Sequence, residues 1–237
     1  QLARSDPELF LQQYQPPVVI DEIQYAPELL PYIKRIVEEL PNVRSVLDGF
    51  SGTTRVSQMF SQLGYDTTAN DSSVWSQVFG TCYLLPGGTD AYYQEILNHL
   101  NALPGTDGWF SEHYGGKEGG TKKPFQIKNT QKLDAIREET ARLNLSAQDR
   151  AVSPTSLILA LDKVDSTLGH YSSYRAQWSP RSYKDLHLEL PHRFKITTRN
   201  VVSRSDIFDA LGKRYDFAYF DPPYGSHNEK MPPSRVR

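Results

Sequence analysis

Near the end of the sequence, an acid, two prolines and a tyrosine follow the short apolar run "DFAYF". These four residues are Asp221, Pro222, Pro223 and Tyr224. The proline pair fixes the backbone and offers carbonyls without N–H groups, so the turn is a rigid hydrogen-bond acceptor beside a carboxylate. A carboxylate and a carbonyl that accept the two hydrogens of a base amine would restore its lone pair for attack on a methyl group. The tyrosine ring would hold the rotated base. Turn chemistry alone is the alternative explanation.

A second polar cluster lies far upstream, in "LDGFSGTT". Asp48 stands at the end of an apolar run, and Gly49 and Gly52 follow it before a helical pattern. Two threonines stand where a dinucleotide fingerprint would need its third glycine, and an acid repels phosphate but attracts an ammonium group. Asp71, at the next strand end, suits the hydroxyls of a ribose. The cluster therefore fits S-adenosylmethionine better than NAD or ATP, unless Asp48 only caps the helix and the glycines only form a tight turn.

The surrounding pattern predicts the elements that position these residues. "VRSVLD" predicts a strand, residues 54–63 a helix that ends at Gly64, and the next run a strand that ends at Asn70 and Asp71. "RNVVSRSDIFDALGKRYDFAYF" predicts strand, short helix and strand. Asp221 follows a strand as Asp48 does, so we expect both acids to face one crevice at the carboxyl ends of parallel strands.

Between these two parts the pattern changes to helices separated by polar, glycine-rich loops. The clearest loop is "HYGGKEGGTKKPFQ". Apolar residues are almost continuous from Leu157 to Leu161, which is typical of a helix buried against a core. This middle part reads as an insertion into an α/β domain.

Composition excludes several classes of protein. The chain has 237 residues, a formal net charge of -2 and one cysteine, which excludes a disulfide framework and a thiolate metal cluster. No apolar run is long enough to span a membrane, so we expect a cytoplasmic protein without a membrane partner. The six histidines lack a metal-ligand spacing, and no metal is assigned.

The two clusters and their order resemble one known family. From about residue 43 to 237 the chain resembles the D12 class (Dam-like) of DNA adenine-N6 methyltransferases. The segments that carry the resemblance are "VLDGFSGTTRV", "TANDSS", "NTQKLDAIREE", "LDKVDSTLGHYSSY", "SRSDIFDAL" and "YFDPPYGSHNEKMPPSRVR". The resemblance implies an α/β fold, with a Rossmann-like S-adenosylmethionine-dependent methyltransferase sheet that is incomplete here and a mostly helical insert. We expect the catalytic core at 41–80 and 200–237 and a target-recognition insert at 81–199.

The same resemblance implies roles for individual residues. Asp48, Phe50 and Gly52 would line the methionine end of the cofactor S-adenosylmethionine, Asp71 its ribose and Asp206 its adenine edge. The catalytic residues would be Asp221, Pro222, Pro223 and Tyr224, which hold the target base. The implied partners are double-stranded DNA and a cognate restriction endonuclease, and the oligomeric state is left open.

The first forty residues differ from that family. They contain "PPVVIDEIQYAPELLPYIK", which resembles the "DEIQ" segment of a bacterial AAA-type ATPase. We expect a strand at 18–20 that ends in Asp21 and Glu22, then a helix from Pro27. A phosphate loop of the form G-x-x-x-x-G-K-[ST] is absent from the sequence, which argues against ATPase activity. We expect a joint between the two kinds of sequence at residues 29–40.

Two other functions compete with adenine methylation. Cytosine N4 is an exocyclic amine to which the same chemistry applies. Alternatively, the chain is an inactive remnant or a DNA-binding fragment, because enzymes of this kind continue their sheet after the acid-proline-proline-tyrosine turn. We therefore expect a longer natural reading frame, and an exposed edge strand before Asp221 in the present chain.

Basic residues gather around two parts of the expected insert and its end. They could contact DNA phosphates or form an ordinary solvated face. They are Lys117, Lys122, Lys123, Lys128, Arg175, Arg181, Lys184, Arg193, Lys195 and Arg199.

Overall fold

The structure is a computed structural model that describes residues 5, 6, 8, 9, 31, 32, 34, 35, 43–117, 119–170 and 173–222. The chain divides into two compact units. The sheet unit comprises Gln1–Leu85 and Phe194–Arg237, and the helical unit comprises Pro86–Arg193. The strand expected at 18–20 and the helix expected from Pro27 lie outside the residues that can be described. No helix in the described part of the chain has the length and apolar character needed to cross a bilayer.

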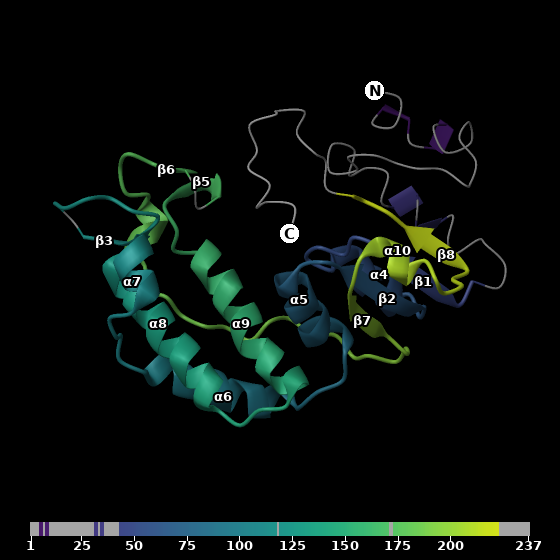
Figure 1. Cartoon of the computed structure of the whole chain (residues 1–237), viewed down its shortest axis with the longest axis horizontal. Helices are drawn as coiled ribbons and strands as arrows, with labels where there is room; N and C mark the ends of the chain where they lie inside the picture. The colour runs from purple at the N-terminus through teal and green to yellow at the C-terminus, as the bar shows by residue number, and fades with distance from the viewer. Residues whose placement is uncertain are drawn as a thin grey trace. The chain divides into compact units, whose positions relative to one another are not determined.

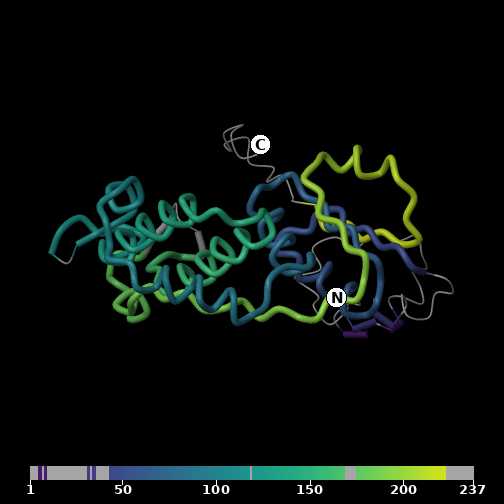
Figure 2. Tube along the Cα trace, turned by 90° about the horizontal axis from the view of Figure 1, so that it is seen from below, coloured from purple at the N-terminus to yellow at the C-terminus, as the bar shows by residue number. Residues whose placement is uncertain are grey.

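The sheet unit is built on four parallel strands in the order β7-β2-β1-β8. The strands are β1 (Ser45–Asp48), β2 (Asp66–Asp71), β7 (Val201–Arg204) and β8 (Phe217–Tyr219). Figure 2 shows the yellow segment with β7 and β8 beside the blue segment with β1 and β2. In chain order, β2 pairs with β1 and β7 pairs with β2 on one side of the sheet, and β8 then pairs with β1 on its other side. The strand order therefore reverses between β1 and β8, the place where open α/β sheets bind their ligands.

Apolar side chains explain why β1 occupies the centre. Val46 and Leu47 are fully buried, as expected for a parallel strand covered on both faces. The ring of Phe60, in α4 (Arg55–Gln62), meets the ring of Phe217 in β8 at a centroid distance of 5.7 Å. Gly64 then adopts a φ of 95°, which turns the chain from α4 into β2. The β-α-β unit expected from the sequence is present.

Two further helices belong to the sheet unit. They are α5 (Val74–Leu84) and the short α10 (Ile207–Ala210). Gly80 allows α5 to approach β7 closely, because a Cβ at this position would lie 2.9 Å from a methyl group of Val202. The expected boundary at residue 80 therefore falls inside a helix that packs on the sheet, and the units divide at Leu85 and Phe194 rather than at 80 and 200.

Asn200 holds together the two points where the insertion leaves and rejoins the sheet unit. Its Nδ2 donates to the carbonyl of Leu84 at 3.0 Å and to Ser61 Oγ at 2.8 Å. Its Oδ1 accepts from the backbone N–H of Thr67 at 3.2 Å. The end of α5 and the segment before β7 are thereby fixed near the same place on the sheet.

The helical unit has its own hydrophobic core, and its helices are labelled in Figure 1. Its helices are α6 (Asp90–Ala102), α7 (Trp109–Tyr114), α8 (Ile127–Arg142) and α9 (Ala147–Asp162), with the 3-10 turn η3 (Pro180–Tyr183). Two short strand pairs complete it, β3 (Gly115–Gly116) with β4 (Phe125–Gln126) and β5 (Thr167–His170) with β6 (Ser173–Tyr174). The core includes Leu97, Leu100, Leu133, Ile136, Leu157, Leu161 and Leu188. The helix expected around Leu157 to Leu161 is thus present and buried.

Two asparagine side chains hold a segment without regular secondary structure against the helices. Asn129 of α8 donates to the carbonyl of Lys184 at 3.0 Å and accepts from the N–H of Leu186 at 2.9 Å. Asn101 of α6 does the same with the carbonyl and N–H of Leu188, at 2.9 and 2.8 Å. The amides replace the strand partner that this backbone lacks, so Leu186 and Leu188 can enter the core without leaving buried polar groups unpaired.

We therefore expect Asn129→Ala to destabilise the helical unit by about 2 to 3 kcal/mol, because the substitution leaves a buried N–H and a carbonyl without partners. Urea unfolding measures the change. It is followed by tryptophan fluorescence in chains with Trp75 replaced by Phe, so that the emission comes from Trp109 and Trp178 of the helical unit. Gln94→Ala is the matched control: it removes one exposed amide contact to Asn98 and should change the stability by less than about 0.5 kcal/mol. Equal stabilities of the two variants would contradict the role given to Asn129.

Candidate active site

Three carboxylates meet at the carboxyl edge of the sheet. Asp48 ends β1, Asp71 ends β2, and Asp221 follows β8 by two residues. Asp48 lies opposite Tyr219 in the parallel register of β1 and β8. Burial is the main cause that raises the pKa of Asp48, and the negative charges of Asp71 and Asp221 add to it, so Asp48 is near enough to interact with each of the other two acids. The structure thus brings together the acids that the sequence predicted at strand ends.

Asp48 is the most constrained of these acids. Its side chain is 1% exposed, and Ser57 Oγ donates to Oδ2 at 2.6 Å. Its other oxygen, Oδ1, is buried without a hydrogen-bond partner among the described residues. Burial is the main cause that raises the pKa of Asp48 from 3.8 to about 7, and the hydrogen bonds from Ser57 oppose this shift. A cation placed at Oδ1 would supply the missing partner.

In the glycine turn after β1, limited space and positive φ angles restrict which residues can occupy each position. A Cβ on Gly49 would lie 2.6 Å from the ring of Phe220, so no larger residue fits there without movement. Gly52 has a φ of 48°. Thr54, the residue before α4, has a φ of 62° and is fully buried, and its Oγ1 accepts from Gln58 Nε2 at 3.1 Å. Thr54 therefore adopts a left-handed conformation that normally favours glycine, at a cost of about 1 to 2 kcal/mol.

Asp71 fastens this turn to β2. Its Oδ2 accepts from the N–H of Gly52 at 2.9 Å, and its Oδ1 accepts from the N–H of Ser73 at 2.8 Å. The sequence predicted contact with ribose hydroxyls. Each carboxylate oxygen retains acceptor capacity beyond its one backbone bond, so such a contact is compatible with the observed bonds. In the structure as it stands, Asp71 positions the glycine turn.

Asn70 is a site residue to which sequence reasoning gave no role. It is buried, and its Nδ2 donates to the carbonyls of Gly49 and Ser205, each at 3.3 Å. Ser205 Oγ donates back to Asn70 Oδ1 at 2.7 Å. One amide therefore joins the ends of β1, β2 and β7. The sequence feature that could have indicated this role is an amide residue directly before the acid that ends a buried strand.

Asp206 lies at the end of β7, where it caps α10. Its Oδ1 accepts from the N–H of Phe208 at 2.9 Å, and the side chain is exposed. Capping satisfies one of the free N–H groups at the start of the helix. The contact with the adenine edge of a cofactor stays a prediction.

The acid-proline-proline-tyrosine turn is described only in its first half. Asp221 and Pro222 are half-buried, whereas Pro223 and Tyr224 lie outside the described residues. Phe220, directly before the acid, meets the ring of Phe50 edge-on at a centroid distance of 6.5 Å. This contact links the start of the turn to the glycine turn after β1.

Several of the basic residues considered for DNA binding have structural partners. Arg193 is largely buried, lies 4.6 Å from the centroid of the Tyr93 ring and donates to the carbonyl of Gly88 at 3.2 Å. Lys128 donates to the carbonyl of Tyr183 at 2.8 Å. Such contacts explain these side chains without DNA.

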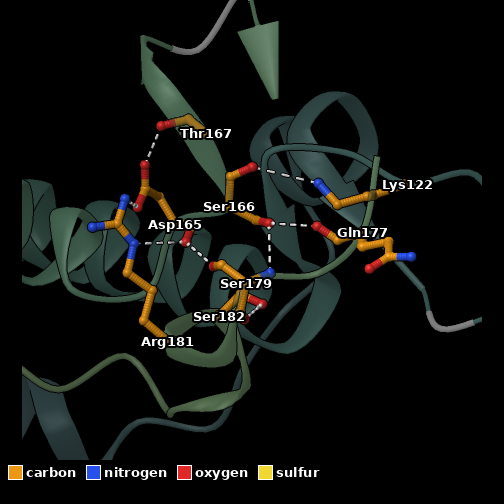
Figure 3. A network of polar contacts seen from close by, with 8 residues as sticks. All are labelled: Lys122, Asp165, Ser166, Thr167, Gln177, Ser179, Arg181 and Ser182. Carbon is orange, nitrogen blue, oxygen red and sulfur yellow. Dashed lines mark hydrogen bonds and ion pairs between the residues drawn. The ribbon is translucent and has the colours of Figure 1, made fainter. Parts of the chain in front are cut away.

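Arg181 and Lys122 belong to a polar network that supports the loop after α9 (Figure 3). Arg181 forms an ion pair with Asp165, which is 3% exposed, and its Nε donates to the Asp165 carbonyl at 3.1 Å. Ser179 Oγ donates to the same carbonyl at 2.8 Å. Lys122 Nζ donates to the carbonyl of Ser166 at 3.4 Å and lies 4.8 Å from the Trp178 ring centroid. In the described part of the chain, no group of three or more His, Cys, Asp or Glu side chains is arranged to hold a metal ion.

Comparisons with known proteins agree with the resemblance of the motifs. The profile of the D12 class N6 adenine-specific DNA methyltransferases matches residues 28–232. Modification methylase StsI of Streptococcus sanguinis is 26% identical over 84% of this chain. Type II methyltransferase M.NlaIII of Neisseria lactamica is 28% identical over 76% of it, and M.CviAII of Paramecium bursaria Chlorella virus 1 is 25% identical over the same share. No solved structure gives a significant match.

The matches cover only part of the relatives. The chain spans 32% of the length of the first and 55% of each of the other two. The family match begins at residue 28, just before the expected joint at 29–40 and earlier than the expected start at about 43. The resemblance of the first residues to an ATPase stays a prediction. The match includes the glycine turn, the strand-end acids and the acid-proline-proline-tyrosine turn. The chain therefore belongs to the D12 class of N6 adenine-specific DNA methyltransferases.

Proposed function

We propose that this chain methylates the N6 amine of an adenine rotated out of double-stranded DNA, with S-adenosylmethionine as the methyl donor. The observation that carries the proposal is the meeting of Asp48 and Asp221 at the point where the strand order reverses, in a chain of this family. The finer description of the fold, a Rossmann-like methyltransferase sheet, is part of the same proposal. It is supported by the parallel strands and their order.

The residues at this edge of the sheet suit this cofactor. The unpaired Oδ1 of Asp48 would accept from the ammonium group of the methionine moiety, and Phe50 and Gly52 would line the same end. Asp71 would accept from the ribose hydroxyls and Asp206 from the adenine amine. The bound cofactor supplies a methyl group on a positively charged sulfur, which makes that carbon electrophilic.

The acid-proline-proline-tyrosine turn would prepare the nucleophile. Asp221 and a carbonyl of the proline pair would accept the two hydrogens of the adenine amine, which draws the nitrogen lone pair out of conjugation with the ring. Tyr224 would stack on the base and hold it in line with the methyl group. The nitrogen gains a carbon and releases a proton to Asp221 or water, and the sulfur keeps the electron pair of the broken bond.

The rest of the molecule has proposed roles as well. The helical unit would read the DNA sequence, as a target-recognition insert does. A cognate restriction endonuclease is the expected partner, because the curated relatives are named as a modification methylase and type II methyltransferases. We place the reaction in the cytoplasm, where bacterial or viral DNA and the cofactor meet. Cytosine N4 is the competing substrate.

Asp221→Ala should lower methyl transfer by roughly 100-fold or more, because the amine loses its charged acceptor. Binding of S-adenosylmethionine, measured by calorimetry, should stay within a few-fold of that of the unmodified chain. The assay is transfer of labelled methyl to unmethylated genomic DNA, followed by analysis of the nucleosides, which separates N6-methyladenine from N4-methylcytosine. Asp209→Ala, an exposed acid on α10, is the control and should leave transfer unchanged. Full activity of Asp221→Ala would contradict the proposed role of this acid.

The raised pKa of Asp48 predicts a pH dependence of cofactor binding. An ammonium at Oδ1 favours the ionised carboxyl, so affinity should increase as the pH rises toward and through about 7. Binding near pH 6 should release a proton, which calorimetry detects as a dependence of the heat on the ionisation enthalpy of the buffer. Asp48→Asn should weaken binding by about 10-fold or more above pH 7 and remove the pH dependence. A pH dependence unchanged in Asp48→Asn would assign it to another group.

The stability of the same variant separates binding from folding. The pKa of Asp48 is raised in the folded chain, so its proton stabilises the fold fully below about pH 3.8, and this contribution is lost as the pH rises through about 7. Asn mimics the protonated acid. Asp48→Asn should therefore resist urea better than the unmodified chain at pH 8, with a smaller difference at pH 5. If Asp48→Asn were less stable than the unmodified chain at pH 8, the ionised Asp48 would have a stabilising partner at Oδ1, contrary to this prediction.

A further inference from the structure

Trp75 has no role in the reaction described above, yet it lies beside the candidate cofactor site. It stands in the first turn of α5 and is 46% exposed, although indole is the largest side chain that proteins bury. We propose that the indole of Trp75 forms a wall of the cofactor crevice on which the adenosine half of S-adenosylmethionine stacks. This inference rests on the proposed function and adds a residue that selects the nucleoside part of the cofactor.

One contact of the Trp75 ring and two nearby hydrogen bonds place Trp75 at the glycine turn. Its ring atom Cη2 lies 3.9 Å from the position that a Cβ on Gly52 would occupy. The neighbouring Ser76 is joined to Ser51 by a buried Oγ–Oγ hydrogen bond of 3.1 Å. The N–H of Gly52 donates to Asp71, the acid that ends β2. The glycine turn, the start of α5 and the end of β2 thus share one corner, and the indole lies on it.

An aromatic neighbour in α5 orients the indole. Phe79, one helical turn further along α5, is 5% exposed and meets the Trp75 ring at 90° with a centroid distance of 5.9 Å. This edge-on contact is a favourable aromatic arrangement, and it fixes the orientation of the indole. Nearly half of the side-chain surface is left open for another group. An aromatic ring fixed in advance binds a flat partner with little loss of conformational freedom.

The position along the sheet favours adenosine over the target base. Asp71, the acid proposed for the ribose, is on β2, whereas Asp221, the acid proposed for the target base, follows β8. β1 lies between these two strands, so the two ends are separated by about 10 Å, twice the distance between neighbouring strands. Trp75 lies at the β2 side, against Gly52. A flat group bound there is the nucleoside of the cofactor.

The fluorescence of Trp75 tests this inference directly. The chain has three tryptophans, and the other two, Trp109 and Trp178, are in the helical unit. With both replaced by Phe, all tryptophan emission comes from Trp75. Addition of S-adenosylmethionine, and of adenosine alone, should change this emission saturably, whereas methionine alone should not.

The matching variants measure affinity. Trp75→Leu should raise the dissociation constant of S-adenosylmethionine by about 2- to 12-fold, the range expected for one lost aromatic contact, and Trp75→Phe should restore most of the loss. The thermal unfolding midpoints of the variants and the unmodified chain should also be compared. If Trp75 had a structural role alone, Trp75→Leu would lower the midpoint and would affect the binding of adenosine and of methionine alike. Trp109→Leu is the control and should leave cofactor affinity unchanged.

The outcomes separate this inference from the proposed function. If the unmodified chain binds the cofactor, the emission of Trp75 does not change on binding and Trp75→Leu binds equally well, the inference is wrong and the proposed function stands. An emission change with a DNA duplex and none with the cofactor would also overturn it and assign Trp75 to DNA. Failure of the unmodified chain to bind S-adenosylmethionine at all would overturn both.

Discussion

The burial of one carboxyl group at the end of the central strand constrains the whole sheet unit. Asp48 is almost inaccessible to solvent, its Oδ1 has no hydrogen-bond partner among the residues that the structure describes, and it lies near two further acids. Burial of a charge that lacks a partner is unfavourable, so burial raises the pKa of Asp48 to about 7, and in the free chain the group is only partly ionised near neutral pH. The polar interior of α4, with Ser57 against Asp48, reduces the penalty without removing it. This remaining penalty supports the proposal that Asp48 binds a cationic group of a ligand.

The polar groups around Asp48 keep this unfavourable arrangement in place. Asn70 joins three strand ends, and Asp71 holds the glycine turn through the N–H of Gly52. Backbone bonds reinforce these links, since the N–H of Ser51 donates to the carbonyl of Asn70 at 2.9 Å and that of Gly49 to the carbonyl of Tyr219 at 2.9 Å. The left-handed conformation of Thr54 persists because both sides of the turn are fixed. Strain and an unpaired carboxyl occur at the same place, as is common at functional sites.

The sequence predicted the features that depend on local pattern. The β-α-β unit, the later strand-helix-strand run and the acids at strand ends all follow from apolar periodicity and from the residues that end strands and helices. The left-handed Thr54 and the exposed Trp75 could not be predicted in this way, because a β-branched residue disfavours that conformation and an indole is usually buried. The asparagines Asn70 and Asn129 act across distant segments, so their roles depend on tertiary contacts. The compact units divide at Leu85 and Phe194, a few residues from the boundaries expected at 80 and 200, because α5 continues past residue 80 as one helix.

The place of the insertion explains how a recognition unit can be added without loss of the site. The helical unit has its own core, and its polar network and asparagine contacts are internal. In the sheet unit, Asn200 bonds Leu84 and Ser61, so the entry and exit of the insertion are fixed near each other whatever lies between them. The edge that carries Asp48, Asp71 and Asp221 is built by β1, β2 and β8, and the hydrogen bonds that hold Asp48 and Asp71 join residues of the sheet unit. Residues of the helical unit, for which a role in DNA recognition is proposed, can therefore change while the strand-end acids keep their arrangement.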